Sequence, residues 1–122
     1  MRLLDESHAL SQSIHTAEGS FLHAIMHRRE PDYANAKYWF RRVGQHPCYA
    51  EIAGQVMRLL ENRGEQELSG TLVPGGDWNP LTFVDACEAA APSPAPHPRV
   101  ETLEAVQEIE FDCLLAHLIR ER

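Results

Sequence analysis

The sequence lacks any long apolar run, and residues 1–15 lack the apolar stretch of a signal peptide. No stretch approaches the roughly 18 consecutive apolar residues that a membrane-spanning helix needs, and residues 1–15 become polar within five positions. We therefore expect neither a signal peptide nor a membrane partner, and we expect a cytoplasmic protein.

Cysteine is scarce as well. The three residues, Cys48, Cys87 and Cys113, are odd in number, lie far apart and form no CxxC pair. This pattern is typical of reduced thiols in a cytosolic protein, and it speaks against a disulfide framework or a cysteine-based zinc site.

Positive charge is the third deficit. Eleven Lys and Arg face eighteen Asp and Glu, which gives a formal net charge of −7, so we expect no nucleic-acid partner. The exception is a basic cluster within residues 28–42. We interpret it as a solvated or salt-bridged helix face, with a phosphate site as the alternative. Its members are Arg28, Arg29, Lys37, Arg41 and Arg42.

The motifs of common catalytic sites are missing too. The sequence has no GxSxG nucleophile turn, no glycine-rich phosphate loop after a strand, no HExxH pair and no two Glu-x-x-His motifs. The Pro-Gly-Gly-Asp segment at 74–77 is typical of a turn. We therefore expect no cofactor, and a divalent metal ion is the alternative.

What the sequence does contain is helical periodicity, which predicts an all-α, single-domain bundle over residues 1–122. The first and last helices are long, a loop covers 65–78, and a proline-rich connector at 91–98 precedes the last helix. SGTLV (69–73) offers at most a short strand without a partner. The five expected helices cover about 5–29, 33–43, 47–62, 80–90 and 99–120.

Local signals predict where the middle helices begin and end. Asp32 is expected to cap the second helix through the amide of Asn35, and Gly44 to end it in a left-handed turn. Pro47 is placed to open the third helix, and Asn-Pro at 79–80 to open the fourth.

The second expected helix is unusually aromatic. Residues 23–47 hold four of the nine aromatic residues, and at about 100° per residue Tyr38 lies roughly opposite Phe40. A short helix that is apolar on several sides is either buried between other helices or touches a second chain.

One combination of residues extends over most of the chain. HRREPDYANAKYWFRR (27–42), followed by Gly44 and His46-Pro47, resembles an uncharacterised family of small helical proteins of bacteria and fungi. FVDACE (83–88) and EIEFDCLL (108–115) resemble later segments of that family. Because the family has no established activity, the resemblance implies a fold. Residues 31–43 also resemble, more weakly and in one copy, a tetratricopeptide-type hairpin.

Two polar residues, Glu110 and His117, fall inside the apolar stripe of the last helix. A buried carboxylate has to be paired or neutralised. We favour an internal pair between Glu110 and an arginine or tyrosine hydroxyl of the aromatic helix. The alternative is a polar pocket in which Glu110 acts as a general base or a ligand.

The first helix carries the alternative metal site. His23, His27 and Glu30 share one face at i, i+4 and i+7, so two imidazoles and a carboxylate could hold one ion. A solvated or interface face is the interpretation we favour for the same residues.

These patterns favour a helical binding or assembly module without catalysis of its own. Its partner is expected to be a protein, with a homodimer included. The alternative is a small-ligand or metal-dependent enzyme with a pocket around His27, Arg28 and Glu110. The candidate binding residues are His27, Arg28, Asp32, Tyr38, Trp39, Arg42, Glu110 and His117.

Overall fold

The computed structural model describes residues 16–94 and 96–120. Within them the chain forms six α-helices, one short 3-10 helix and no strand. The predicted all-α class is therefore confirmed, and the expected five helices are one too few. The elements are α2 (Ala17–Arg29), α3 (Tyr33–Val43), α4 (Cys48–Asn62), α5 (Gln66–Leu72), η1 (Pro74–Gly76), α6 (Pro80–Ala90) and α7 (Pro98–Arg120).

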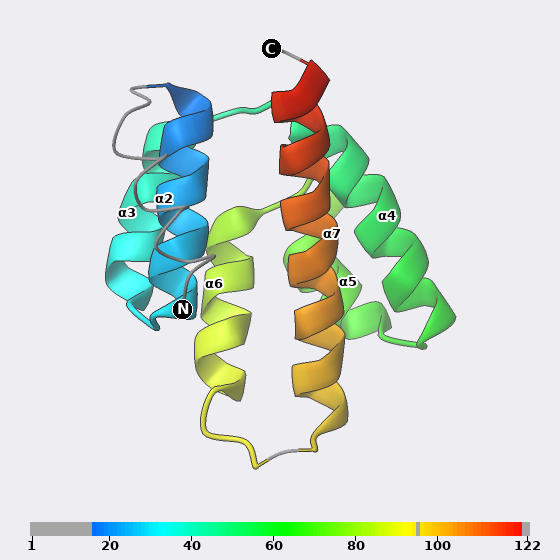
Figure 1. Ribbon diagram of the computed structural model, residues 1–122. Helices are drawn as coiled ribbons and strands as arrows, with labels where there is room; N and C mark the ends of the chain where they lie inside the picture. Colours follow the sequence, from blue (N-terminus) through cyan, green and yellow to red (C-terminus); the bar gives the residue numbers. More distant parts are fainter. Residues whose placement is uncertain (1–15, 95, 121–122) are drawn as a thin grey trace. The chain divides into compact units, whose positions relative to one another are not determined.

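The contacts divide the chain into two compact units, Met1–His46 and Pro47–Arg122. In the first unit α2 and α3 pack along each other (Figure 1). In the second unit α4 contacts α5 and α7, and α6 also contacts α5 and α7. These four helices therefore enclose one apolar core. The single domain over residues 1–122 stays a prediction.

Each unit buries apolar side chains that recur at helical spacing. The edge of the Phe21 ring meets Phe40 at a centroid distance of 5.8 Å, which joins α2 to α3. The first unit buries Phe21, Leu22, Ile25, Met26, Ala36, Phe40 and Val43. The second buries Ile52, Val56, Leu60, Leu68, Leu72, Phe83, Val84, Leu103, Val106 and Leu114.

The first predicted helix, 5–29, is wrong as one continuous element. Thr16 is extended, with φ of −130° and ψ of 175°, and its side chain accepts the amide of Gly19 at 3.2 Å. A threonine in this role is an N-cap, so α2 begins at Ala17. The predicted portion at 5–15 lies outside the described residues.

The boundaries of α3 agree with the sequence signals. Asp32 accepts the amide of Asn35 at 3.4 Å, and Gly44 ends the helix with a φ of +65°. A positive φ is strained for residues with a Cβ, which explains a glycine here. The predicted starts at Pro47 and Asn79 are also correct to within a residue, because α4 begins at Cys48 and Asn79 caps α6.

The loop predicted for 65–78 is wrong, and so is the short strand proposed inside it. Residues 66–72 form α5, and Pro74–Gly76 form a 3-10 turn. Leu68 and Leu72, one helical turn apart, are both buried. Helix α5 contacts α4 and α6, and burial of the two leucines stabilises a seven-residue helix that is too short to form by propensity alone.

The last predicted helix is confirmed as α7, whose 23 residues follow the proline-rich connector. Its first turn follows His97, whose Nδ1 accepts the amide of Arg99 at 3.1 Å. Among the described residues, no helix is both long enough and apolar enough to cross a membrane.

Candidate functional site

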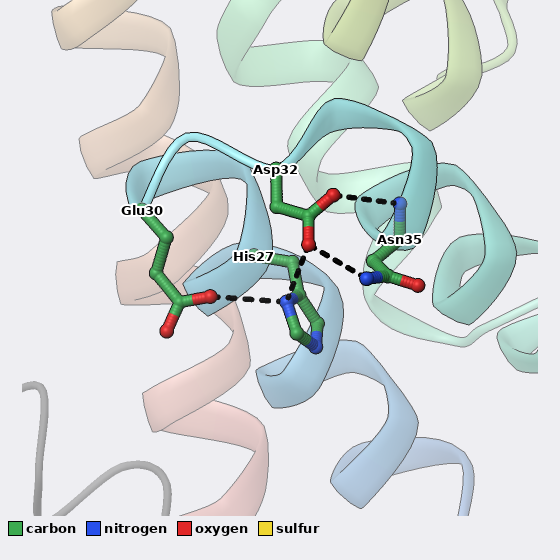
Figure 2. Close-up of polar contacts among 4 residues, drawn as sticks. All are labelled: His27, Glu30, Asp32 and Asn35. Atoms are coloured by element: carbon green, nitrogen blue, oxygen red, sulfur yellow. Dashed lines mark hydrogen bonds and ion pairs between the residues drawn. The ribbon is translucent and has the colours of Figure 1, made fainter.

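The turn between α2 and α3 gathers four polar side chains (Figure 2). Nδ1 of His27, at the end of α2, lies 3.0 Å from a carboxylate oxygen of Glu30 and 3.8 Å from one of Asp32. The second Asp32 oxygen caps α3, and the Asn35 amide group donates to Asp32 at 2.6 Å. The histidine and the two carboxylates therefore stabilise the turn that precedes α3.

The three residues of the alternative metal site lie close together but do not form a ligand set. His23 and His27 share a face, with ring centroids 5.5 Å apart. Within residues 16–46, no three His, Cys, Asp or Glu side chains bring ligand atoms within 4.8 Å of one another. The His23 ring instead stacks on Trp39 at 4.3 Å, with 28° between the planes.

Trp39 is the centre of an aromatic cluster on α3. Tyr38 meets its ring edge-on, with 5.2 Å between centroids and 88° between planes. The guanidinium of Arg42 lies 5.4 Å from the Trp39 centroid and 5.9 Å from that of Tyr38. Nη1 of Arg42 also donates to the Tyr38 hydroxyl at 3.5 Å. Two rings and one hydroxyl thus hold this arginine in place.

The outer side of this cluster is open to solvent. Tyr38 is 49% exposed, and Arg41 and Arg42 are exposed as well. We call Tyr38, Arg41 and Arg42 the α3 face. The helix contains no Asp or Glu, and Lys37, the only lysine of the sequence, adds a third positive charge. The α3 face therefore combines positive charge with an aromatic ring. Arg41 was a candidate only as part of the basic cluster.

Arg28 takes no part in an open site. It is 3% exposed, and its guanidinium lies 5.7 Å from the centroid of Phe40. On the same helix Glu18 lies 2.7 Å from Nε2 of the buried His46, whose ring meets Phe21 edge-on at 5.3 Å. The helical pattern places Glu18 near the apolar side of the helix, but it does not predict His46 as its partner.

Glu110 and His117 belong to α7, in the second unit. Glu110 is fully buried, and His117 is half-buried. The neighbour of Glu110 on α4 is Tyr49, which is itself buried. Burial, the nearby Glu110 charge and Cys48 raise the pKa of the Tyr49 phenol. The expected pair between Glu110 and an arginine or tyrosine of the aromatic helix stays a prediction.

The two buried thiols of the second unit also lie near each other. Cys48 donates from Sγ to the carbonyl of Cys113 at 3.6 Å, and Gln55 donates to the Cys113 sulfur at 3.5 Å. Burial, followed by the charges of Glu51 and Cys48, raises the pKa of Cys113 to about 11. Such a thiol is a poor nucleophile at neutral pH.

A cavity of about 350 Å³ lies among α5, α6 and α7. Its polar groups are largely engaged with the protein itself. Arg99 pairs with Glu65 at 3.2 Å, and the Thr82 hydroxyl donates to the Thr71 carbonyl at 2.7 Å. Because α5 was not predicted, the sequence offered no sign of this cavity.

The chain matches no protein-family model, no curated protein and no solved structure. The resemblance of residues 27–47, 83–88 and 108–115 to a family of small helical proteins therefore stays a prediction. Function has to be inferred from the chemistry of the side chains.

Proposed function

We propose that this chain is a binding module without catalytic activity of its own, and that its α3 face binds an acidic segment of a protein. The observation that carries this proposal is the exposed arginine held on aromatic rings. Arg42 lies over Tyr38 and Trp39 and donates to the Tyr38 hydroxyl.

This arrangement favours binding because much of the conformational freedom of Arg42 is already lost in the free protein. Ordering a long side chain at an interface costs roughly 0.5–1.5 kcal/mol. A guanidinium that is fixed beforehand avoids part of that cost and can meet a carboxylate with two parallel hydrogen bonds. Tyrosine and arginine are also the residues that most often dominate binding energy at protein interfaces.

The charge of the helix favours an acidic partner. α3 has three positive residues and no negative one, in a chain whose formal net charge is −7. Among the described residues, Arg41 and Arg42 have no ion-pair partner. A partner that supplies carboxylates would neutralise charges that the fold itself leaves uncompensated.

The aromatic rings are less suited to stacking nucleobases. Trp39 already has His23 stacked against it and Arg42 nearby, and it is only half-exposed. Single-stranded nucleic acids bind mainly to open aromatic faces lined by positive charge. The α3 face therefore fits a carboxylate-bearing peptide better than a nucleic-acid strand.

The enzyme alternative has weaker support. Nδ1 of His27 lies against two carboxylates, and Arg28 is buried over a phenylalanine ring. These contacts favour structural roles for His27 and Arg28.

A defined peptide tests the proposal. We would measure the fluorescence anisotropy of a labelled helical peptide of glutamates and leucines, beside a counterpart in which glutamine replaces every glutamate. The acidic peptide is expected to bind, and Arg42→Ala and Tyr38→Ala should each weaken binding about tenfold, since about 1.4 kcal/mol corresponds to that factor. Arg58→Ala, an exposed arginine of α4, is the matched control. Equal affinity of both peptides, or binding that Arg42→Ala leaves unchanged, would refute the proposal.

A further inference from the structure

The charges of the chain are divided unevenly between its two units. Residues 1–46 carry six Lys and Arg and five Asp and Glu, whereas residues 47–122 carry five and thirteen. The formal charges are thus +1 and −8. An acidic surface that could meet the α3 face of another molecule is therefore present on the chain itself.

Helix α7 presents that surface as one narrow stripe. Six of its exposed residues recur every three or four positions, which places these six on one side of the helix, whereas the exposed Arg99 and Arg120 do not follow this spacing. The first four are acidic, and the last two are apolar, with Leu115 39% and Ile119 65% exposed. We call this set the α7 stripe. Its members are Glu101, Glu104, Glu108, Asp112, Leu115 and Ile119.

The four carboxylates of the α7 stripe have no ion-pair partner among the described residues. Like charges at such spacing repel one another along the helix. A row of arginines from outside would relieve this repulsion. The two exposed apolar side chains at the end of the row offer a surface for an aromatic ring.

We infer that the partner of the α3 face is a second copy of this chain, bound through its α7 stripe. The inference rests on the proposed function and names its partner. Charge complementarity carries it, because the basic, aromatic face and the acidic, apolar stripe are both exposed and both lack ion pairs. Guanidinium groups and carboxylates match each other in geometry as well as in charge.

The order of residues also fixes a direction. Along α3 the tyrosine comes before the arginines, and along α7 the carboxylates come before the apolar pair. In an antiparallel arrangement of α3 and α7 of the other copy, Tyr38 lies on Leu115. Arg41 and Arg42 then reach Asp112 and Glu108. A parallel arrangement cannot make both contacts at once. At 1.5 Å per residue, Tyr38 to Arg42 spans roughly 6 Å along α3, and Glu108 to Leu115 spans roughly 10 Å along α7.

Charge reversal on each side tests this inference. R41E/R42E reverses the two arginines of the α3 face, and E108R/D112R reverses the two carboxylates that these arginines are expected to reach. Each variant alone is expected to stay at the 13.8 kDa of a single chain when its mass is measured by light scattering. An equimolar mixture should regain at least the doubled mass expected of the wild-type protein, because the reversed α3 face of one variant then meets the reversed carboxylate positions of the other. High salt should dissociate both the wild-type protein and the mixture of variants.

Several outcomes would overturn the inference. Wild-type protein that stays at 13.8 kDa at the highest soluble concentration has no second copy as partner. A dimer that survives E108R/D112R but not R41E/R42E would show that the α3 face binds a surface other than the α7 stripe. A mixture that fails to associate, although circular dichroism finds both variants helical, also contradicts it. Where a reversed variant loses helicity, R41Q/R42Q and E108Q/D112Q replace it and should weaken association at least tenfold.

The peptide titration separates this inference from the proposed function. Protein that binds the acidic peptide yet remains monomeric keeps its proposed function and loses the second copy as partner. Protein that neither binds the peptide nor self-associates loses both.

Discussion

The carboxylate of Asp32 lies 3.8 Å from Nδ1 of His27 while its other oxygen caps α3, so one side chain ties the end of α2 to the start of the next helix. Removing it with Asp32→Ala is expected to lower the free energy of unfolding by about 1 kcal/mol, the usual cost of losing an N-cap. Urea denaturation followed by circular dichroism measures this loss.

Asp32→Asn is the matched control for that variant. Asparagine caps helices about as well as aspartate, so it keeps an acceptor for the backbone amide of Asn35, while it removes the charge near His27 and the acceptor for the Asn35 side chain. We expect Asp32→Asn to retain most of the stability. An equal loss in both variants would mean that the charge, and not the cap, is what matters.

Gly70 lies inside α5, where an added methyl group meets no atom within 4 Å. Gly70→Ala should therefore stabilise the protein by about 0.5–1 kcal/mol, since alanine has the higher helix propensity. Gly64→Ala is the contrasting variant, because Gly64 has a φ of +69° and should lose stability. Thermal denaturation of the two variants should give shifts of opposite sign. A destabilising Gly70→Ala would contradict a helix at residues 66–72.

The buried thiol of Cys113 makes stability depend on alkaline pH. Its pKa is raised from 9.0 to about 11, so folding favours the neutral form. The corresponding stability is fully present below pH 9 and is lost as the pH rises through 11. Over that window one such group changes the free energy of unfolding by up to about 1.4 kcal/mol per pH unit.

Urea denaturation across this pH window, for wild type and Cys113→Ser, measures that loss. The serine variant should have the flatter profile because its hydroxyl does not ionise there. The buried Tyr49, whose pKa is also raised, adds a decline at higher pH that Tyr49→Phe should remove. Identical profiles for Cys113→Ser and wild type would contradict this account.

His46 is buried between Glu18, at 2.7 Å, and the edge of the Phe21 ring. His46→Ala removes both contacts. We expect the free energy of unfolding to fall by about 2 kcal/mol, the usual contribution of a buried hydrogen bond to a charged group. Gln45→Ala, at the exposed neighbouring position, should change stability very little. If both variants unfold at the same urea concentration as wild type, the pair contributes nothing measurable.

The helix ends were predictable because each depends on a few adjacent residues. The side chains of Asp32 and Asn79 accept the free backbone amides at the starts of α3 and α6. Gly44 takes the positive φ at the end of α3. Thr16 carried the same kind of signal, but the apolar periodicity running past it predicted a continuous helix.

Elements and contacts that depend on packing were not predictable. α5 owes its helical state to Leu68 and Leu72 against neighbouring helices, and seven residues with a glycine give too little periodicity. The effect of the Glu110 charge on the pKa of Tyr49 likewise depends on two helices that are distant in sequence. His23 and His27 were correctly placed on one face, yet only the folded pair of helices reveals that Trp39 stacks on His23.

Lys37 is a site for selective chemical labelling that needs no mutation. Apart from the amino terminus it carries the only primary amine of the chain, and it lies on α3, one turn before Arg41. An amine-reactive dye therefore attaches beside the α3 face, where its emission reports an approaching partner. A carbodiimide would join this lysine only to a carboxylate in direct contact with it, so sequencing the cross-linked peptide would identify that carboxylate by residue number.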